Sequence, residues 1–223
     1  MKVSDALNSR KTIRAFKADP ISQEVLTDIL ETASRTASGG NLQPWHVHVL
    51  GPNDVQKLVD KVAAQLPETP MGQGAEYDIY PRKLKDPYKS RRFDIGERMY
   101  ATLGIPREDK AARLMWFANN FRFFGAPNAF IFSIDRQMCE GQWSDLGMFI
   151  QSIMLLAREY GLDTCPQEAW AIWQGTIREM FEIPEDRIVF CAMGIGYRDD
   201  EAVVNSLDSP RAPLEEWASF SGF

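Results

Sequence analysis

A cluster of cationic side chains near the start of the chain has the composition of an anion site. Arg10, Lys11 and Arg14 fall within five residues, and the hydroxyl of Thr12 lies between them. The arginine guanidinium is a planar fork that can hold two phosphate oxygens at once, and a threonine hydroxyl supplies a further donor. The same residues could equally be the solvated basic end of the first helix. Both interpretations stay open for the cluster taken by itself.

A second polar stretch, residues 36–45, combines two adjacent glycines with two amides and a following tryptophan. The glycines allow a sharp turn of the backbone, and the side chains of Asn41 and Gln43 can both donate and accept hydrogen bonds. Pro44 biases Gln43 toward an extended backbone. We expect a polar loop that suits recognition of a flat polar ring. The alternative is an ordinary connection between a helix and a strand.

Helices and strands must position these two stretches. Ser22 is a helix-capping residue, and apolar residues then recur at the spacing of one buried face, at Leu26, Ile29, Leu30 and Ala33. This helix is expected to end near residues 34–36, just before the polar loop. The remaining pattern predicts strands over 46–50, 128–134 and 187–193 and helices from 52 and over 88–103, 107–121, 142–160 and 176–181.

The predicted helix over 142–160 is apolar almost all round. Such a helix must be buried on every side, so it is either the central core helix or part of a subunit interface. Gly161 stands at the expected C-terminal cap. The last stretch, 205–223, carries Trp217, Phe220 and Phe223. We expect this tail to pack against a partner subunit.

Composition limits the class of protein. The 223 residues are 44% hydrophobic and 25% charged, as in a soluble globular chain of one domain or two tightly joined parts. The net charge of -6 argues against a general nucleic-acid binder. No stretch predicts a membrane span, and residues 1–5 have no apolar signal core. We therefore expect a cytoplasmic protein.

The cysteines and histidines do not indicate a metal centre. Cys139, Cys165 and Cys191 are widely spaced and form no Cys-x-x-Cys pair, so neither a zinc site nor a redox dithiol is indicated. His46 and His48 would share one face of a strand, but no acidic or thiol partner lies nearby in the sequence. Metal catalysis and a Ser-His-Asp hydrolase are both disfavoured.

Residues 67–106 differ from the rest of the chain because they are rich in proline, glycine, tyrosine and charge. A long excursion in a compact domain is often a lid or a pocket wall. Its aromatic residues either contact a flat substrate or pin the excursion to the body, and pinning is favoured for most of them. Later, Gly194 and Gly196 lack the third glycine and the following helix of a dinucleotide fingerprint, which excludes that motif.

Four segments in this order resemble the FMN-dependent nitroreductase family: residues 9–16, 37–45, 124–127 and 194–197, followed by Arg211. The segment 37–45 is the most specific. The resemblance implies an α+β sandwich in which helices flank a central, mostly antiparallel sheet. It implies a single FMN-binding domain over 1–223, with the excursion at about 67–106 lining the substrate pocket. It also implies an intertwined homodimer that exchanges its C-terminal tails.

The resemblance assigns cofactor contacts to residues from both ends of the chain. Arg10, Thr12 and Arg14 match phosphate and ribityl contacts, and Arg211 closes on the phosphate. Lys11 stands where the family often has arginine, which leaves the role of Lys11 open because lysine cannot make a bidentate contact. Three loop residues match positions that reach the flavin from the partner subunit: Ser38, Asn41 and Gln43. Gly194 falls near the phosphate end, and a backbone amide within Pro166, Gln167 and Glu168 falls where the flavin's central nitrogen is hydrogen-bonded.

The function implied by the resemblance is a ping-pong reaction. NADH or NADPH reduces FMN and leaves, and a flat nitroaromatic or quinone-like acceptor then takes its place. No side chain is assigned as a general acid, and the candidate pocket walls are Phe124, Tyr88, Tyr77, Tyr80 and Phe93. Three alternatives keep the FMN residues: reductive dehalogenation, fragmentation of the flavin and reduction of activated alkenes. A non-catalytic flavin-binding protein and a non-flavin structural dimer are the remaining alternatives.

Overall fold

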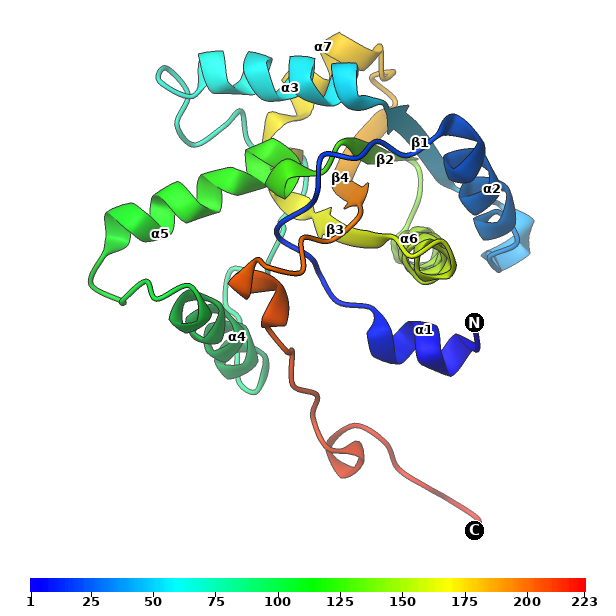
Figure 1. The fold of residues 1–223 in the computed structure, drawn as a ribbon. Helices are drawn as coiled ribbons and strands as arrows, with labels where there is room; N and C mark the ends of the chain where they lie inside the picture. Colours follow the sequence, from blue (N-terminus) through cyan, green and yellow to red (C-terminus); the bar gives the residue numbers. More distant parts are fainter.

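A four-stranded sheet lies at the centre of the computed structural model, which describes residues 1–223 (Figure 1). Its strands are β1 (Trp45–Leu50), β2 (Asn128–Asp135), β3 (Asp163–Gln167) and β4 (Arg187–Gly196), in the spatial order β1-β2-β4-β3. Every neighbouring pair is antiparallel. The expected α+β class with an antiparallel central sheet is confirmed.

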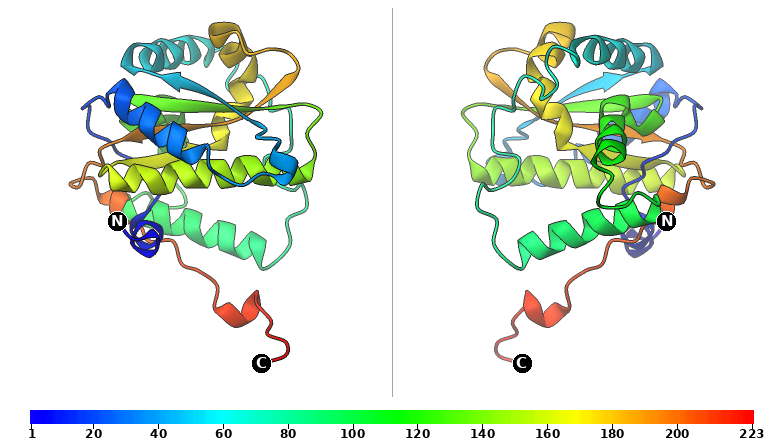
Figure 2. Two further views of the ribbon diagram at one scale, coloured as in Figure 1. Left: turned by 90° about the vertical axis from the view of Figure 1, so that its right-hand side faces the viewer. Right: turned by 90° about the vertical axis from the view of Figure 1, so that its left-hand side faces the viewer.

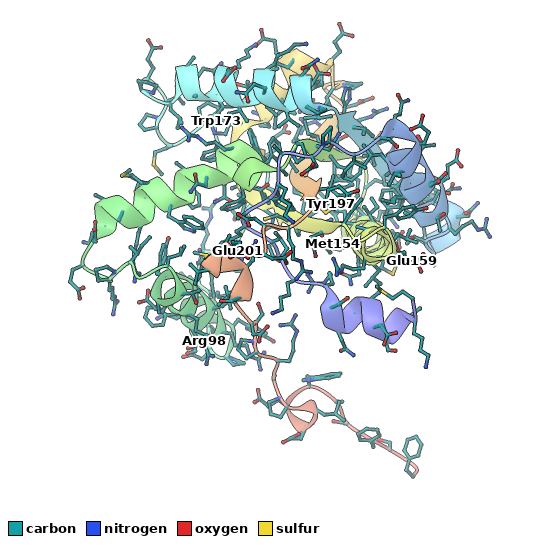
Figure 3. All side chains as sticks on the ribbon, viewed as in Figure 1. Arg98, Met154, Glu159, Trp173, Tyr197 and Glu201 are labelled. Carbon is teal, nitrogen blue, oxygen red and sulfur yellow. The ribbon has the colours of Figure 1, made fainter.

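Both faces of the sheet are covered by helices (Figures 1 and 2). One face packs against α2 (Gln23–Ala33) and α6 (Glu140–Glu159), and the other against α3 (Pro52–Gln65) and α7 (Gln174–Phe181). Met154 and Trp173 mark these two layers in Figure 3.

The central strand β2 contains an uninterrupted apolar run over residues 129–132. This run is buried on both faces of the sheet. Phe130 and Phe132 belong to the core on the α6 side, whereas Ala129 and Ile131 belong to the core on the α3 side. Successive side chains of a strand point to opposite faces, so this run fills two cores at once.

The helix caps follow the sequence signals. Ser22 Oγ accepts a hydrogen bond from the backbone N–H of Val25 at 3.4 Å, and α2 begins at the next residue after the serine. Gly161 has a φ of +69° directly after the C-cap of α6, a conformation that favours glycine. The expected burial of α6 on every side is not seen in the single chain, where Gly147 is exposed and Met148 is 44% exposed.

Three short or surface helices complete the fold. They are α1 (Val3–Ser9), α4 (Tyr88–Thr102) and α5 (Lys110–Phe117). The prediction of one helix over 107–121 was too long. The chain continues from α5 as a 3₁₀ segment (Ala118–Gly125), in which Phe123 and Phe124 have φ values of 49° and 53°. Two consecutive left-handed residues end a right-handed helix.

The excursion and the tail extend from this body. α4 is the helical part of the excursion and lies below the sheet and α6 in Figure 2. The tail leaves the body beyond it, and its residues Trp217, Phe220 and Phe223 are all largely exposed. None of the helices combines the length and the hydropathy that crossing a bilayer requires.

Candidate functional site

A cavity of about 410 Å³ brings the two ends of the chain together. Its wall contains Arg10, Lys11, Thr12 and Arg14 from the segment after α1, and Arg211 from the tail. We call it the arginine cavity. All the residues that the sequence assigned to phosphate binding at the two chain ends therefore lie in one wall.

Backbone hydrogen bonds fix the segment that carries these cations. The N–H of Ile13 donates to the carbonyl of Thr164 on β3 at 3.1 Å. The N–H of Arg14 donates to Asn205 Oδ1 at 2.8 Å, and Asn205 Nδ2 donates to the carbonyl of Ala15 at 2.9 Å. The sheet edge and a side chain close to the tail thus hold the segment in place.

The arginine cavity carries an excess of positive charge. Lys11 pairs with Asp208 at 2.5 Å, but Arg10, Arg14 and Arg211 form no ion pair. Partial burial, together with the positive charge of Arg211, lowers the pKa of Arg10. Cations that are partly desolvated and close to each other are stabilised by a bound anion. The geometry therefore suits an anionic group.

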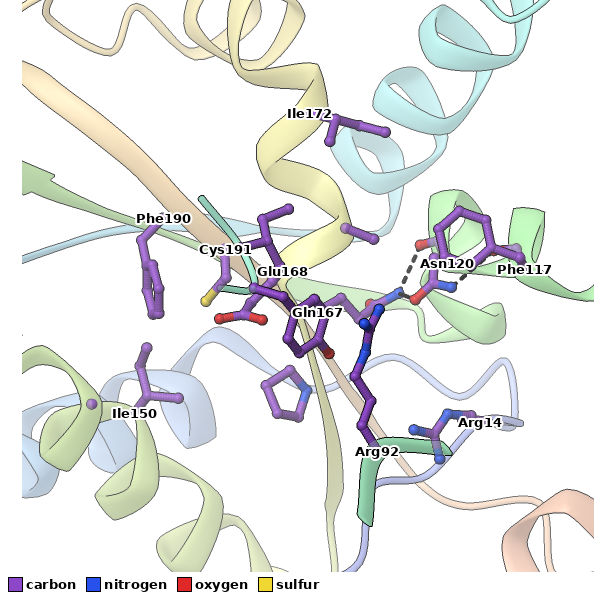
Figure 4. A pocket seen from close by; sticks show the side chains of 15 residues that line it. Arg14, Arg92, Phe117, Asn120, Ile150, Gln167, Glu168, Ile172, Phe190 and Cys191 are labelled. Carbon is purple, nitrogen blue, oxygen red and sulfur yellow. Dashed lines mark hydrogen bonds between the residues drawn. The ribbon is translucent and has the colours of Figure 1, made fainter. Parts of the chain in front are cut away.

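A second cavity, of about 670 Å³, has Arg14 in its wall, as the first does. We call it the ring cavity (Figure 4). Its floor comes from the end of β3 and from β4, with Pro166, Gln167, Glu168 and Cys191. Its roof comes from the excursion, with Ile79, Tyr80 and Arg92. Its other lining residues are mostly apolar and include Phe117, Ile150, Ile172 and Phe190.

The polar groups of the floor have few partners within the chain. Gln167 Nε2 donates to the carbonyl of Asn120 at 2.7 Å, whereas the buried Gln167 Oε1 has no hydrogen-bond partner. Glu168 forms no ion pair or side-chain hydrogen bond, and burial raises its pKa. Burial also raises the pKa of the Cys191 thiol, with a further contribution from the charge of Glu168. Unpaired polar atoms in a cavity wall are available to a bound molecule.

The polar loop lies away from both cavities of its own chain. Ser38, Asn41 and Gln43 line neither cavity, and the loop rests on α6 through a hydrogen bond from Gly39 N–H to Asp145 Oδ2 at 3.1 Å. The expectation of an extended Gln43 was wrong, because its φ is +49°. Its N–H donates to Ser38 Oγ and its Nε2 to the carbonyl of Asn41, and these contacts close the loop on itself.

Three further candidate residues lie outside the walls of both cavities. Gly194 is buried in β4, where an added Cβ would lie 3.0 Å from Ala126 Cβ, so a larger residue there would crowd the neighbouring chain. Phe124 is buried in the wall of a third cavity of about 450 Å³, which Arg14, Trp116 and Arg122 also line. Tyr88 is 62% exposed at the first turn of α4.

The expectation that most of the excursion aromatics pin it to the body holds only for Tyr77. Tyr77 pins the excursion, since its hydroxyl donates to the carbonyl of Phe190 at 2.6 Å and its ring packs against Trp143. Tyr80 lines the ring cavity, whereas Phe93 is 53% exposed. The sequence reasoning missed Asn120 and Arg92 because they reach the cavity from separate elements and belong to no motif.

Comparison with known proteins places this chain in a family. Residues 7–197 match the family described as "Nitroreductase family". The chain is 33% identical to a chloronitrobenzene nitroreductase of Comamonas testosteroni, with coverage of 98% of this chain and 96% of the relative. It is 35% identical to a 4-nitrobenzoate reductase of Pseudomonas putida, with coverage of 96% and 93%.

Solved structures agree with the sequence comparison. The FMN and NADPH-dependent nitroreductase NfnB from Sphigopyxis sp. strain HMH superposes with a TM-score of 0.96 at 45% identity, over 100% of both chains. The FMN-dependent nitroreductase NfnB from Mycobacterium smegmatis, solved in complex with NADPH, has a TM-score of 0.92 at 28% identity, over 99% of this chain and 100% of that one. The chain therefore belongs to the nitroreductase family.

Proposed function

We propose that this chain binds FMN and uses NADH or NADPH to reduce nitroaromatic or quinone-like acceptors. The presence of Arg14 in the walls of both the arginine cavity and the ring cavity is the observation that carries the proposal. FMN has the same order of parts, with a phosphate at one end, a ribityl chain and a flat ring. The relatives described as nitroreductases over nearly the full chain support the same conclusion.

The residues present fit FMN at both ends. The unpaired Arg10 and Arg211 supply charge-assisted donors for a phosphate, with Lys11 and the Thr12 hydroxyl beside them. Arg14 lines both cavities and would face the ribityl chain. At the other end, the orphaned Gln167 Oε1 is an acceptor for a donor on the bound ring. Pro166 and Glu168 border that end.

Bound FMN supplies the redox chemistry, by taking electrons from the nicotinamide and delivering them to the acceptor. The chain's own residues bind and orient the participants. Phe190, Ile150 and Ile172 give the ring cavity apolar walls that exclude water from a flat molecule. The excursion at about 67–106 acts as the roof of the substrate pocket and belongs to one FMN-binding domain over 1–223.

We also propose a homodimer in which each FMN is held by both subunits. Ser38, Asn41 and Gln43 line neither cavity of their own chain and would serve the partner's site. The exposed face of α6 at Gly147 and Met148, and the exposed aromatics of the tail, are the surfaces that such a partner would cover. The three cysteines are free, as expected in the reducing cytoplasm where we place the reaction.

An anaerobic absorbance experiment tests the proposal. The purified protein is mixed first with NADH or NADPH and then with nitrobenzene or a quinone. We expect a yellow protein that bleaches with the donor and regains its colour with the acceptor, and the faster donor shows the preference. A yellow protein that does not bleach would contradict the reductase function while leaving FMN binding intact. Gel filtration with light scattering measures the dimer separately.

A further inference from the structure

The charges of the ring cavity point to the kind of acceptor that it selects. We propose that Arg92 binds the carboxylate of an acidic aromatic acceptor, so that the site favours nitroaromatic acids over neutral nitroaromatics of the same shape. The inference rests on the proposed function, because it concerns the acceptor that the reduced enzyme meets.

Arg92 is placed and oriented for this contact. It lies on α4 in the roof, and its guanidinium carbon is 3.8 Å from the centre of the Tyr80 ring, which also lines the cavity. Figure 4 shows the Arg92 side chain reaching from α4 toward Gln167 in the floor. Stacking on an aromatic face orients the guanidinium plane while leaving its N–H groups free for hydrogen bonds.

Three other arginines on or beside α4 have carboxylate partners, whereas Arg92 has none. Arg91 pairs with Glu216 at 2.6 Å, Arg98 with Asp94 at 2.7 Å and Arg113 with Glu97 at 2.6 Å. No ion pair or hydrogen bond engages Arg92. In a chain with a net charge of -6, this is a free cation that faces a cavity.

The cavity as a whole is positive. Arg14 and Arg92 are its cations and Glu168 is its single carboxyl group. Burial raises the pKa of Glu168, which favours the neutral form of that carboxyl group. A cleft lined by one sign of charge focuses the field and raises the local concentration of the opposite ion. Two arginines therefore face a single carboxyl group in the ring cavity.

The walls restrict the anion to a flat aromatic molecule. Phe190, Ile150 and Ile172 offer apolar surface for a ring, and the planar Arg92 fork matches a carboxylate through two parallel hydrogen bonds. Arg14 is shared with the arginine cavity and is engaged there with the cofactor in the proposed function. Arg92 is the cation that remains for a second molecule.

The test compares two acceptors that differ in charge and little in shape, 4-nitrobenzoate and 4-nitrobenzamide. Steady-state kcat/KM is measured for both with the wild type, Arg92→Gln and the matched control Arg98→Gln on the same helix. We expect Arg92→Gln to lower kcat/KM for 4-nitrobenzoate by about ten- to a hundredfold, the usual effect of losing a hydrogen bond to a charged group. In Arg92→Gln, kcat/KM for 4-nitrobenzamide should change by less than about twofold. Arg98→Gln should leave kcat/KM for both acceptors unchanged.

The phosphates of the nicotinamide donor are also anions that Arg92 could bind. A second set of measurements, with the donor varied, distinguishes this possibility from binding of the acceptor's carboxylate. KM is measured for NADPH and NADH with 4-nitrobenzamide as acceptor. If Arg92→Gln raises KM for NADPH and leaves the ratio of the two acceptors as in the wild type, the bound anion is the donor's phosphate and the inference is overturned. An equal fall in kcat/KM for the acid and the amide in Arg92→Gln also overturns the inference, because that result assigns Arg92 a structural role.

A binding measurement distinguishes failure of this inference from failure of the proposed function. Calorimetry on the oxidised holoprotein measures the Kd of benzoate and of benzamide without any turnover. We expect benzoate to bind more tightly to the wild type than benzamide does, and Arg92→Gln to weaken benzoate about tenfold with no effect on benzamide. Equal binding of the two compounds to the wild type would overturn the inference. Selective benzoate binding in a protein without reductase activity would overturn the proposed function alone.

Discussion

The floor and the roof of the ring cavity are built in different ways. The floor continues from strands β3 and β4, and behind it lie Trp170 and Trp173, both completely buried. The roof carries Tyr80 and Arg92, both exposed, on an excursion whose helix α4 has no buried residue. One wall is part of the core, and the other is a surface segment.

A few contacts at the base of the excursion hold the roof. The N–H of Gln73 donates to the carbonyl of Ile172 at 2.7 Å, and Glu76 pairs with Arg178 at 3.0 Å. The Tyr77 hydroxyl bond to the carbonyl of Phe190 completes the anchor. Beyond residue 77 the ion pairs within the excursion are mostly exposed, and such pairs contribute little to stability. The comparison indicates that the floor is a rigid part of the core, whereas the roof is joined to the body by few contacts.

The largest predicted effect separates the two walls by stability. Trp170 stacks on Phe123 with ring centres 4.4 Å apart and is fully buried, so Trp170→Ala should lower the free energy of unfolding by about 3–5 kcal/mol. In the roof, Phe93→Ala removes an exposed ring and should change the free energy of unfolding by less than about 0.5 kcal/mol. Urea unfolding measures both variants. Similar losses in the two variants would contradict the contrast between floor and roof.

The next effect concerns the cofactor that we place against the floor. Arg10→Ala removes one charge-assisted contact to the FMN phosphate, at a cost of about 1.5–3 kcal/mol. The Kd for FMN should therefore rise by about ten- to a hundredfold. Quenching of FMN fluorescence measures it. Arg35→Ala is the matched control, because Arg35 is an exposed arginine outside both cavities. An unchanged Kd in Arg10→Ala would refute the phosphate assignment.

A smaller effect tests the anchor of the roof. Tyr77→Phe removes the hydrogen bond to the Phe190 carbonyl and should cost about 1 kcal/mol. Limited proteolysis should then cut faster within residues 78–106, while the rest of the chain keeps its protection. Tyr160→Phe serves as the control because the Tyr160 hydroxyl makes no hydrogen bond. If both variants are cut at the wild-type rate, the anchor lies elsewhere.

The smallest effect depends on pH and concerns Glu168. Burial raises its pKa in the folded state, so the folded chain keeps this proton at pH values where the unfolded chain has lost it. Stability therefore falls as the pH rises from about 4.3, the ordinary value for glutamate, through the folded-state pKa. Glu168→Gln removes this penalty and should raise Tm at pH 7 but not at pH 4. Thermal scans at the two pH values measure the difference, and a gain of equal size at both would rule out titration as its cause.

The core elements could be predicted from the sequence because burial leaves a periodic pattern. Leu26, Ile29 and Ala33 mark the buried face of α2, and all three are buried as expected. Strand β3 was not predicted, since it has five residues and contains Pro166. β3 is an edge strand, where a proline is tolerated because one side of the strand needs no donor.

The candidate site was predictable to the extent that its residues have distinctive chemistry. Arginine is the residue type expected at a phosphate, so Arg10 and Arg211 could be named from the sequence. In the structure both line the arginine cavity. Phe124 was expected in the pocket wall, but its φ of 53° and that of Phe123 turn the chain there, and such backbone angles cannot be read from residue types. Arg92 was missed because the excursion is rich in cations and only the folded helix shows which of them faces the cavity.

The bond between Arg14 and Asn205 has a consequence for synthesis of the protein. It joins residues 191 positions apart, and the arginine cavity also needs Arg211 from the tail. Contacts over such separations form late in folding because the chain must first close a long loop. A nascent chain on the ribosome cannot build this cavity until almost its whole length has been translated. Messages cut short before codon 205 would yield chains that lack both Asn205 and Arg211, and we expect such chains to retain FMN poorly.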